Sequence, residues 1–213
     1  MQPHLHDVVV TALRWISGLS VAIAAGLLVS FVVAFRRPRI ATARRDDQAM
    51  VAVIDFLRSL PIIALVPVVQ LVGVQEGYKI ALIAWAAAFP ILISTRQALR
   101  LPMIDLELTI LGSGLSPWFV FWRYALPKAL LGVVAGVEVS IGVAWIAVVA
   151  AEWLGNYTVG FWSGGLGVRI VAAHDANSWP GVIACLVAFG VLGTGSSVIW
   201  RAAIRRLQFR IHI

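Results

Sequence analysis

Several ionisable residues stand inside long apolar stretches, where a charge is costly to hold. Glu138 and Glu152 lie in one such stretch, and Asp55 and Arg58 lie in another. Charged side chains at membrane depth are expensive, so they mark pairing partners or a path that carries a solute. We interpret Arg58, Glu138 and Glu152 as candidates for a translocation path or a gate.

A purely structural role is the alternative for each of these groups. Asp55 and Arg58 are three residues apart, so they share one helix face and can pair locally; Arg58 can also pair with Glu138. Glu152 is expected at the outer end of its stretch. There it is either an interfacial carboxylate in contact with water or part of a gate. Pro61 joins the candidates because it lacks an amide N–H and should break or kink its helix.

The remaining polar residues do not suggest a catalytic centre or a metal site. His174 and Asp175 are adjacent, and His4 and His6 lie two apart, but neither pair has further ligands or a nucleophile nearby in the sequence. The single cysteine, Cys185, excludes an intrachain disulfide. The P-loop pattern G-x-x-x-x-G-K-[ST] does not occur, so this chain is not itself an ATPase. We expect no enzyme activity, cofactor or metal in it.

The composition points to a membrane protein with several spans. Of the 213 residues, 61% are hydrophobic and 13% are charged, whereas soluble domains carry about 25% charged residues. A span needs about 20 apolar residues, and isolated strands cannot satisfy their backbone in lipid. Five stretches qualify: residues 8–35, 48–74, 77–97, 127–152 and 180–200. We expect an all-α, polytopic bundle that forms one domain over residues 1–213.

The distribution of basic residues sets the orientation of these spans. Thirteen of the 17 lysines and arginines lie in the loop 36–45, the region 96–128 and the C-terminal tail. The opposite loops carry Lys79 and Arg169, and we expect Glu76 and Lys79 to form a solvated turn. The positive-inside rule then places the N-terminus outside and the C-terminus in the cytoplasm. Basic residues at the ends of apolar runs also argue against a nucleic-acid-binding face.

Glycines and prolines indicate where helices approach closely or bend. Gly132, Gly136 and Gly142 lie in one expected span, and small residues are common at the interfaces of membrane helices. Pro61 and Pro67 should interrupt another span. These residues provide either static packing or the freedom for helices to rearrange.

An aromatic stretch on the cytoplasmic side, LGSGLSPWFVFWRYALP (residues 111–127), interrupts the spans. Gly112 and Gly114 break the helical pattern, and Ser116 followed by Pro117 fits the start of a helix. The aromatic residues that follow recur at helical spacing: Trp118, Phe119, Phe121 and Trp122. The stretch predicts a short surface helix, which either lies on lipid or docks in a groove of a soluble partner.

Residues from about 50 to about 170 resemble the permease subunits of bacterial ABC importers, and within them the nitrate, sulfonate and taurine branch. The motifs that carry the resemblance occur in order: R-x-L-P, A-L-V-P, K-I-A-L-I, F-P-I-L, L-P, A-W, A-E and G-L-G. The resemblance implies a type I importer fold in the bacterial inner membrane. It also implies that the chain moves a small solute by alternating access.

The resemblance assigns contact with the ATPase to a coupling segment at about residues 105–127. Members of the family carry an E-A-A triplet ahead of a glycine, with a proline at a fixed distance after it. Pro127 lies 13 residues after Gly114, which is the spacing of that signature. The triplet positions hold other residues here: Leu108, Thr109 and Ile110. The implied coupling residues are Gly112, Gly114, Leu115, Ser116, Pro117, Trp118, Phe119, Trp122 and Pro127.

The resemblance also implies that the chain works in a complex. Its partners would be a second permease subunit, the same or different, two cytoplasmic ATPase subunits that bind ATP and Mg²⁺, and an extracytoplasmic solute-binding protein. The solute would be a sulfonate, nitrate, taurine or a similar small compound, or else a vitamin-like one. Two alternatives are a membrane scaffold subunit that moves no solute and a membrane component that binds substrate without a separate binding protein.

Overall fold

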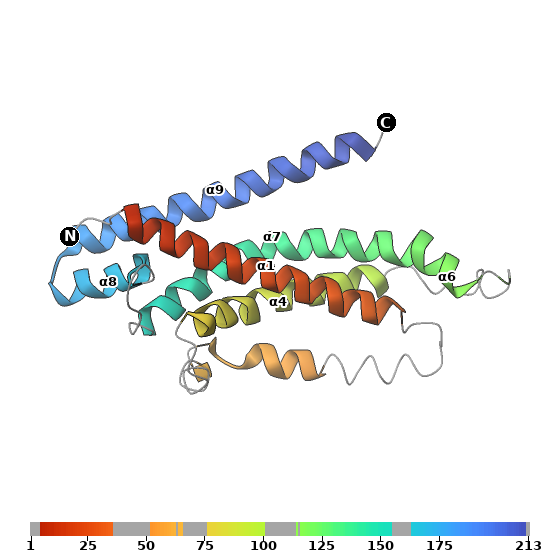
Figure 1. Ribbon diagram of the computed structural model, residues 1–213, viewed down its shortest axis with the longest axis horizontal. Helices are drawn as coiled ribbons and strands as arrows, with labels where there is room; N and C mark the ends of the chain where they lie inside the picture. Colours follow the sequence, from red (N-terminus) through yellow and green to blue (C-terminus); the bar gives the residue numbers. More distant parts are fainter. Residues whose placement is uncertain are drawn as a thin grey trace.

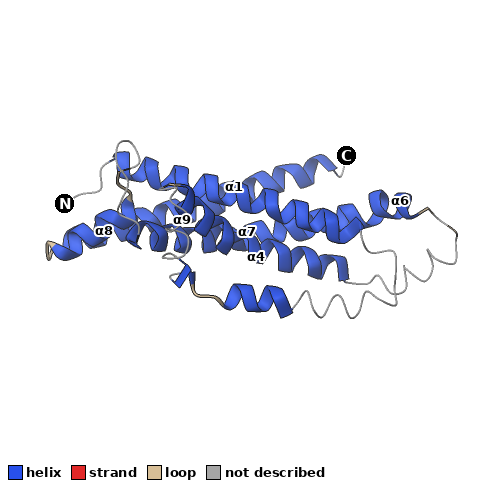
Figure 2. Ribbon diagram, turned by 60° about the horizontal axis from the view of Figure 1, so that its bottom comes forward, coloured by secondary structure: helices blue, strands red, loops and turns tan. Residues whose placement is uncertain are grey.

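The computed structural model describes residues 5–35, 52–62, 64–65, 76–100, 114, 116–154 and 163–211. All regular elements in these ranges are helical (Figure 2). The long helices are α1 (Leu5–Phe35), α4 (Gly77–Arg100), α7 (Leu126–Leu154) and α9 (Trp179–Ile211). Within the described residues, these four are long and apolar enough to cross a membrane. The expected all-α class is therefore confirmed.

Four of the five expected spans coincide with these helices, with boundaries that differ by a few residues. The remaining expected span, residues 48–74, lies partly outside the described residues. Its described part is helical over 52–59, bends at Leu60 and leaves the helix at Pro61. The break predicted at Pro61 is thus confirmed, whereas Pro67 lies outside the described residues.

Helices α1, α4 and α7 run side by side, whereas α9 starts beside them and diverges toward its C-terminal end; the bundle has two ends (Figure 1). The α8 end holds the start of α1, the short helix α8 (Leu166–Asp175) and the start of α9. The α6 end holds the end of α1 and the short helix α6 (Pro117–Val120), which leads into α7. Because α1 ends at the α6 end and α4 begins at the α8 end, the chain passes from one end to the other between these two helices.

Close packing of α4 against α7 depends on two of the three glycines that the sequence singled out. A Cβ atom on Gly132 would lie 2.5 Å from the Cα of Thr95, and one on Gly136 would lie 2.5 Å from the Cα of Ile91. Backbone cannot yield at such distances, so only glycine fits there. At Gly142, by contrast, an added Cβ would meet no atom within 4 Å.

Contacts inside the bundle provide partners for hydrogen-bonding groups that lipid could not provide. Ser140 of α7 donates a hydrogen bond of 2.6 Å to the carbonyl of Ala87 in α4. The rings of Trp15 and Trp145 stack with their centroids 4.9 Å apart, which joins α1 to α7. Trp145 also donates through Nε1 to the hydroxyl of Ser196 at 3.0 Å. That bond ties α9 to α7, although most of α9 is left uncovered by the rest of the chain.

Candidate functional site

Arg14 of α1 lies at the centre of a group of buried charges at the α8 end. Its Nε and Nη2 donate to the two carboxylate oxygens of Glu76 at 2.8 and 2.9 Å. Its Nη1 donates to Oε1 of Glu152 at 2.8 Å and to the carbonyl of Gly164 at 2.7 Å. The side chains of Arg14 and Glu152 are both 0% exposed. One guanidinium therefore joins α1, the start of α4, the end of α7 and the segment before α8.

Two further ion pairs extend this group. Lys79, fully buried in the first turn of α4, places its Nζ 3.1 Å from Oε1 of Glu76. Arg169 of α8 donates through Nε to Oδ2 of Asp7 at 2.7 Å. We call these six residues the ion cluster: Asp7, Arg14, Glu76, Lys79, Glu152 and Arg169. It contains three carboxylates and three cations, so its charges balance.

The charge state of Glu76 follows from these neighbours. Burial alone would raise the pKa of its carboxyl, because a charge is poorly solvated there. The hydrogen bonds and positive charge of Arg14, followed by those of Lys79, act in the opposite direction and prevail. The pKa of Glu76 therefore lies below its ordinary value, and the carboxylate is ionised at neutral pH.

Side chains from other helices cap the first turn of α8. The backbone amides of residues 165–167 donate in order to Asp7 Oδ1 at 3.2 Å, Thr11 Oγ1 at 2.8 Å and Glu152 Oε2 at 2.9 Å. The first amides of a helix have no partner within it, and negative charge is favourable at that end. The start of α8 is thus bound to α1 and α7 rather than to its own side chains.

Glycines allow this close approach. Gly164 and Gly165 have φ angles of 137° and 132°, a region that other residues rarely adopt. A Cβ on Gly165 would lie 2.5 Å from Oε1 of Glu152. The glycines of the GGLG motif, residues 164–167, therefore let the chain pass against the buried carboxylate and begin α8.

The ion cluster corrects two expectations from the sequence. Glu152 is not an interfacial carboxylate in contact with water, and Glu76 and Lys79 do not form a solvated turn. Arg14 binds both glutamates and lies more than 60 residues away in sequence from each of them, whereas Lys79 pairs with Glu76. The signal that was available is that Arg14 lies in an apolar stretch with no acidic residue three or four positions away.

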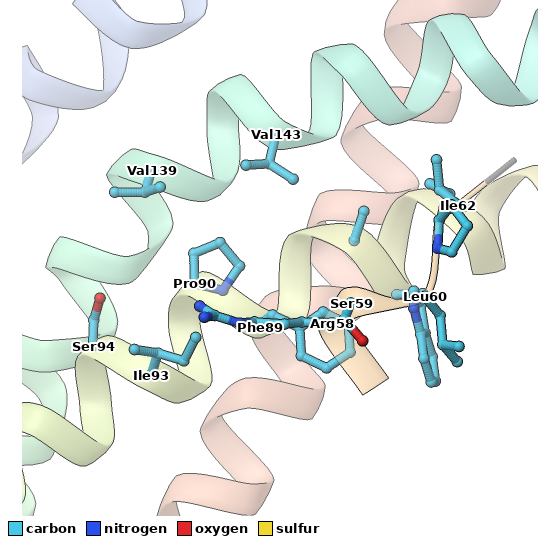
Figure 3. Close-up of a pocket in the computed structure, with 13 residues that line it drawn as sticks. Arg58, Ser59, Leu60, Ile62, Phe89, Pro90, Ile93, Ser94, Val139 and Val143 are labelled. Carbon is cyan, nitrogen blue, oxygen red and sulfur yellow. The ribbon is translucent and has the colours of Figure 1, made fainter. Parts of the chain in front are cut away.

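A second feature is a cavity of about 660 Å³ between residues 58–62, α4 and α7 (Figure 3). Arg58 and Pro61, both candidates from the sequence, contribute to its wall. Trp85 and Phe89 of α4 line it and meet edge to face, with their ring centroids 5.2 Å apart. The other wall residues that the structure describes are aliphatic apart from two serines.

The candidate charges from the sequence do not converge on one place. Arg58 pairs with Asp55 at 3.2 Å, as the spacing predicted. It does not pair with Glu138, whose Oε1 instead accepts a hydrogen bond of 2.8 Å from Nε of Arg201 in α9. Arg58 lies at the cavity, Glu152 lies in the ion cluster, and Glu138 lies in a pair whose side chains are exposed on the single chain.

The described part of the aromatic stretch begins at Gly114, which has a φ of 67°. The helix α6 starts at Pro117, as predicted, and three aromatic side chains on this stretch are about half exposed: Trp118, Phe119 and Trp122. Phe121 is instead buried and meets Phe31 of α1 edge to face at 5.1 Å. Ser116 and Pro127 are exposed, and Gly112 and Leu115 lie outside the described residues.

The expected short surface helix is continuous with a span. Residues Phe121–Ala125 form a π-helix, η1, between α6 and α7. Pro127, the second residue of α7, has no N–H to donate to the carbonyl of Arg123, so an ordinary α-helical turn would lose a hydrogen bond and clash there. A wider turn is one way in which a helix absorbs such a mismatch. The aromatic stretch is thereby joined to α7 without a loop.

No cluster of metal-binding side chains lies among the described residues: none of their His, Cys, Asp and Glu side chains form a group of three or more that could hold a metal ion.

Residues 22–209 match the protein family described as "Binding-protein-dependent transport system inner membrane component".

Individual relatives agree with this family. A putative ABC transporter permease of Methanocaldococcus jannaschii is 28% identical, over 89% of this chain and 67% of that protein. A putative aliphatic sulfonates transport permease of Bacillus subtilis is 28% identical, over 92% of this chain and 65% of that protein. A formylaminopyrimidine transport permease of Halalkalibacterium halodurans is 26% identical, over 90% of this chain and 70% of that protein.

A solved structure shares the fold. A chain of the MetNI methionine ABC transporter in an inward-facing conformation matches with a TM-score of 0.69 at 20% identity. The match covers 94% of both chains.

Proposed function

The chain belongs to the family of binding-protein-dependent transport system inner membrane components, and from this premise we propose how its parts serve an ATP-driven importer. It is the multi-pass, membrane-spanning permease and not the ATPase. As proposed, five spans place the α6 end in the cytoplasm and the α8 end outside. Two permease subunits, identical or different, form the path, and two ATPases drive alternating access.

The exposed aromatic side chains at the α6 end support an ATPase contact there. Trp118 is 57% exposed, and Phe119 and Trp122 are each 48% exposed. Large aromatic side chains are common anchors in protein interfaces. Because η1 joins this stretch to α7, a displacement by the ATPase acts on a span directly. This continuity is the observation that carries the proposed coupling role.

Cross-linking to the ATPase tests this assignment. We expect Ser116→Cys in a Cys185→Ser background to cross-link to a P-loop subunit that copurifies with the chain, in a nucleotide-dependent manner. Ser116 is preferred to Gly114, whose φ of 67° a cysteine would strain. Trp179→Cys in the same background is the control, because Trp179 is exposed at the α8 end. Equal cross-linking at both positions, or none at Ser116→Cys in any nucleotide state, contradicts the assignment.

The α8 end suits the side that receives a loaded binding protein. There the ion cluster links α1 and α7 and is tied directly to the start of α8, so a partner that moves α8 also moves the partners of Arg14. We propose that docking of the binding protein shifts this end between closed and open states. The mechanism requires two states that both ATP and the loaded binding protein bias.

The proposed solute is a small anion, with sulfonates as the first class to test. The Bacillus subtilis relative is named for aliphatic sulfonates, and the described residues of the cavity wall include one cation and no carboxylate. The name of the Halalkalibacterium halodurans relative favours a second class, small heterocyclic compounds of the formylaminopyrimidine kind. Uptake of radiolabelled ethanesulfonate and formylaminopyrimidine by the complete complex in proteoliposomes discriminates between the two classes.

A further inference from the structure

The geometry points to the cavity beside Arg58 as a subsite within the permease for a small organic anion, which holds the anionic head at the guanidinium and the apolar body against Trp85 and Phe89. This inference deepens the proposed function and rests on it. It concerns a site in the permease itself, separate from whatever the binding protein recognises.

The size and depth of the cavity fit a small solute. Its volume of about 660 Å³ falls within the range of about 300–1,000 Å³ typical of sites for small molecules. It lies along the middle of α4, where Trp85, Phe89 and Ser94 contribute to the wall, and along the middle of α7. A solute that crosses the membrane therefore meets it between the two ends of the bundle.

The charge of the wall favours an anion. Among the described residues, Arg58 is the one charged residue that lines the cavity, and its ion-pair partner Asp55 is not part of the wall. That pair uses Nε of Arg58, so the planar guanidinium still presents Nη1 and Nη2. Among the residues that the structure describes, neither terminal nitrogen has a recorded partner. Two parallel N–H groups of this kind match the oxygens of a carboxylate, sulfonate or phosphate.

The position of the guanidinium brings this charge to the apolar wall. Figure 3 shows the Arg58 side chain extending from its own segment toward α4, with its nitrogens beside Pro90 and near Phe89. Ser94 lies further along α4 and offers a hydroxyl on the same wall. A head group with two or three acceptor oxygens would find donors here, while a short carbon chain would lie against the aromatic rings.

Thiol labelling tests the site without relying on transport. The chain has one native cysteine, so Ser94→Cys in a Cys185→Ser background places a single thiol in the cavity wall. Two methanethiosulfonate reagents of similar size are compared, one ending in a sulfonate and one in an ammonium group. The control is Gln97→Cys, which lies one turn away on α4, is exposed and does not line the cavity.

We expect the ratio of anionic to cationic labelling rates at Ser94→Cys to exceed the ratio at Gln97→Cys by about tenfold, as for a nearby charge in partly solvated surroundings. Arg58→Gln should abolish this excess, and Arg58→Lys should retain part of it. Ethanesulfonate should slow the labelling at Ser94→Cys and leave Gln97→Cys unchanged. Arg201→Gln, which removes an arginine outside the cavity, should leave both ratios unchanged.

The outcomes separate this inference from the proposed function. Equal ratios at the two positions, or an excess that survives Arg58→Gln, overturn the subsite even if the complex transports a sulfonate. If labelling behaves as expected but no solute is taken up by the complete complex, the subsite stands and the proposed solute class fails. Circular dichroism of each purified variant excludes misfolding as the cause of a lost excess.

Discussion

Glu138 and Glu152 lie on the same helix, α7, yet their carboxylates meet opposite surroundings. Glu152 is fully buried and contacts Arg14, Thr11 and the amide of Gly167. Glu138 pairs with Arg201, and the two side chains are 47% and 62% exposed. An exposed ion pair contributes at most about 1 kcal/mol, whereas removal of one partner from a buried pair leaves a charge without compensation.

This contrast gives a prediction for a matched pair of substitutions. Glu152→Gln should lower the free energy of unfolding by roughly 3 kcal/mol, because the amide cannot balance the charge of Arg14. Glu138→Gln should change it by less than about 1 kcal/mol. Unfolding of both purified variants in mixed detergent micelles, followed by circular dichroism, measures the difference. Equal stabilities would show that the buried pair has no structural role.

Glu76 makes part of the stability dependent on pH. Because its pKa is lowered in the folded protein, its contribution is complete above the ordinary pKa of glutamate, about 4.3. The contribution is lost as the pH falls through the lower, folded value. We expect the melting temperature to stay level as the pH falls from about 7 to about 5 and to decrease below about 4.

Glu76→Gln is the control for this pH dependence. The variant should melt at a lower temperature than the native protein at neutral pH. Its melting temperature should also fall less on acidification, because the carboxyl group that titrates is gone. Parallel melting curves for the variant and the native protein across the acid range would count against Glu76 as the source.

At the scale of elements, the contact between α4 and α7 depends on where side chains are missing. Gly136 faces the backbone of α4, whereas Gly142 faces open space. Overpacking of such a contact costs about 1–3 kcal/mol, and alanine in an open helical position is favoured over glycine by roughly 1 kcal/mol. Substitution by alanine should therefore lower the stability at Gly136 and leave it unchanged or raise it at Gly142.

We predict that Gly136→Ala lowers the melting temperature of the purified protein and that Gly142→Ala leaves it unchanged or raises it. Differential scanning fluorimetry in detergent compares the two variants directly. A second copy of the chain packed at Gly142 would reverse the second result. Loss of stability in Gly142→Ala at all protein concentrations would contradict the single-chain packing described for α7.

The helices could largely be predicted from the sequence, whereas the partners of their charges could not. Runs of apolar residues and the break at Pro61 depend on neighbours in the chain, so the sequence contains their cause. The ion cluster depends on contacts between distant residues, such as Arg14 and Glu152, which lie 138 positions apart. The Asp55–Arg58 pair was predicted correctly because its two residues are only three positions apart in the chain. Local spacing also led to the wrong expectation for Lys79.

At the scale of the whole molecule, α7 connects the two regions to which partners are assigned. Its 29 residues span about 43 Å at about 1.5 Å per residue. One end continues through η1 into the exposed aromatic stretch, and the other carries Glu152 into the ion cluster. In the proposed cycle, a movement of α7 would displace both ends together, and α4, packed against it at Gly132 and Gly136, would move with it.

The balance of charge in the ion cluster has an energetic consequence for a cell with an energised membrane. Moving one elementary charge across a membrane potential changes its energy by about 2.3 kcal/mol per 100 mV. The cluster contains three carboxylates and three cations, so its displacement as a unit transfers no net charge through the field. The membrane potential would therefore do no net work on the cluster when its six residues move together.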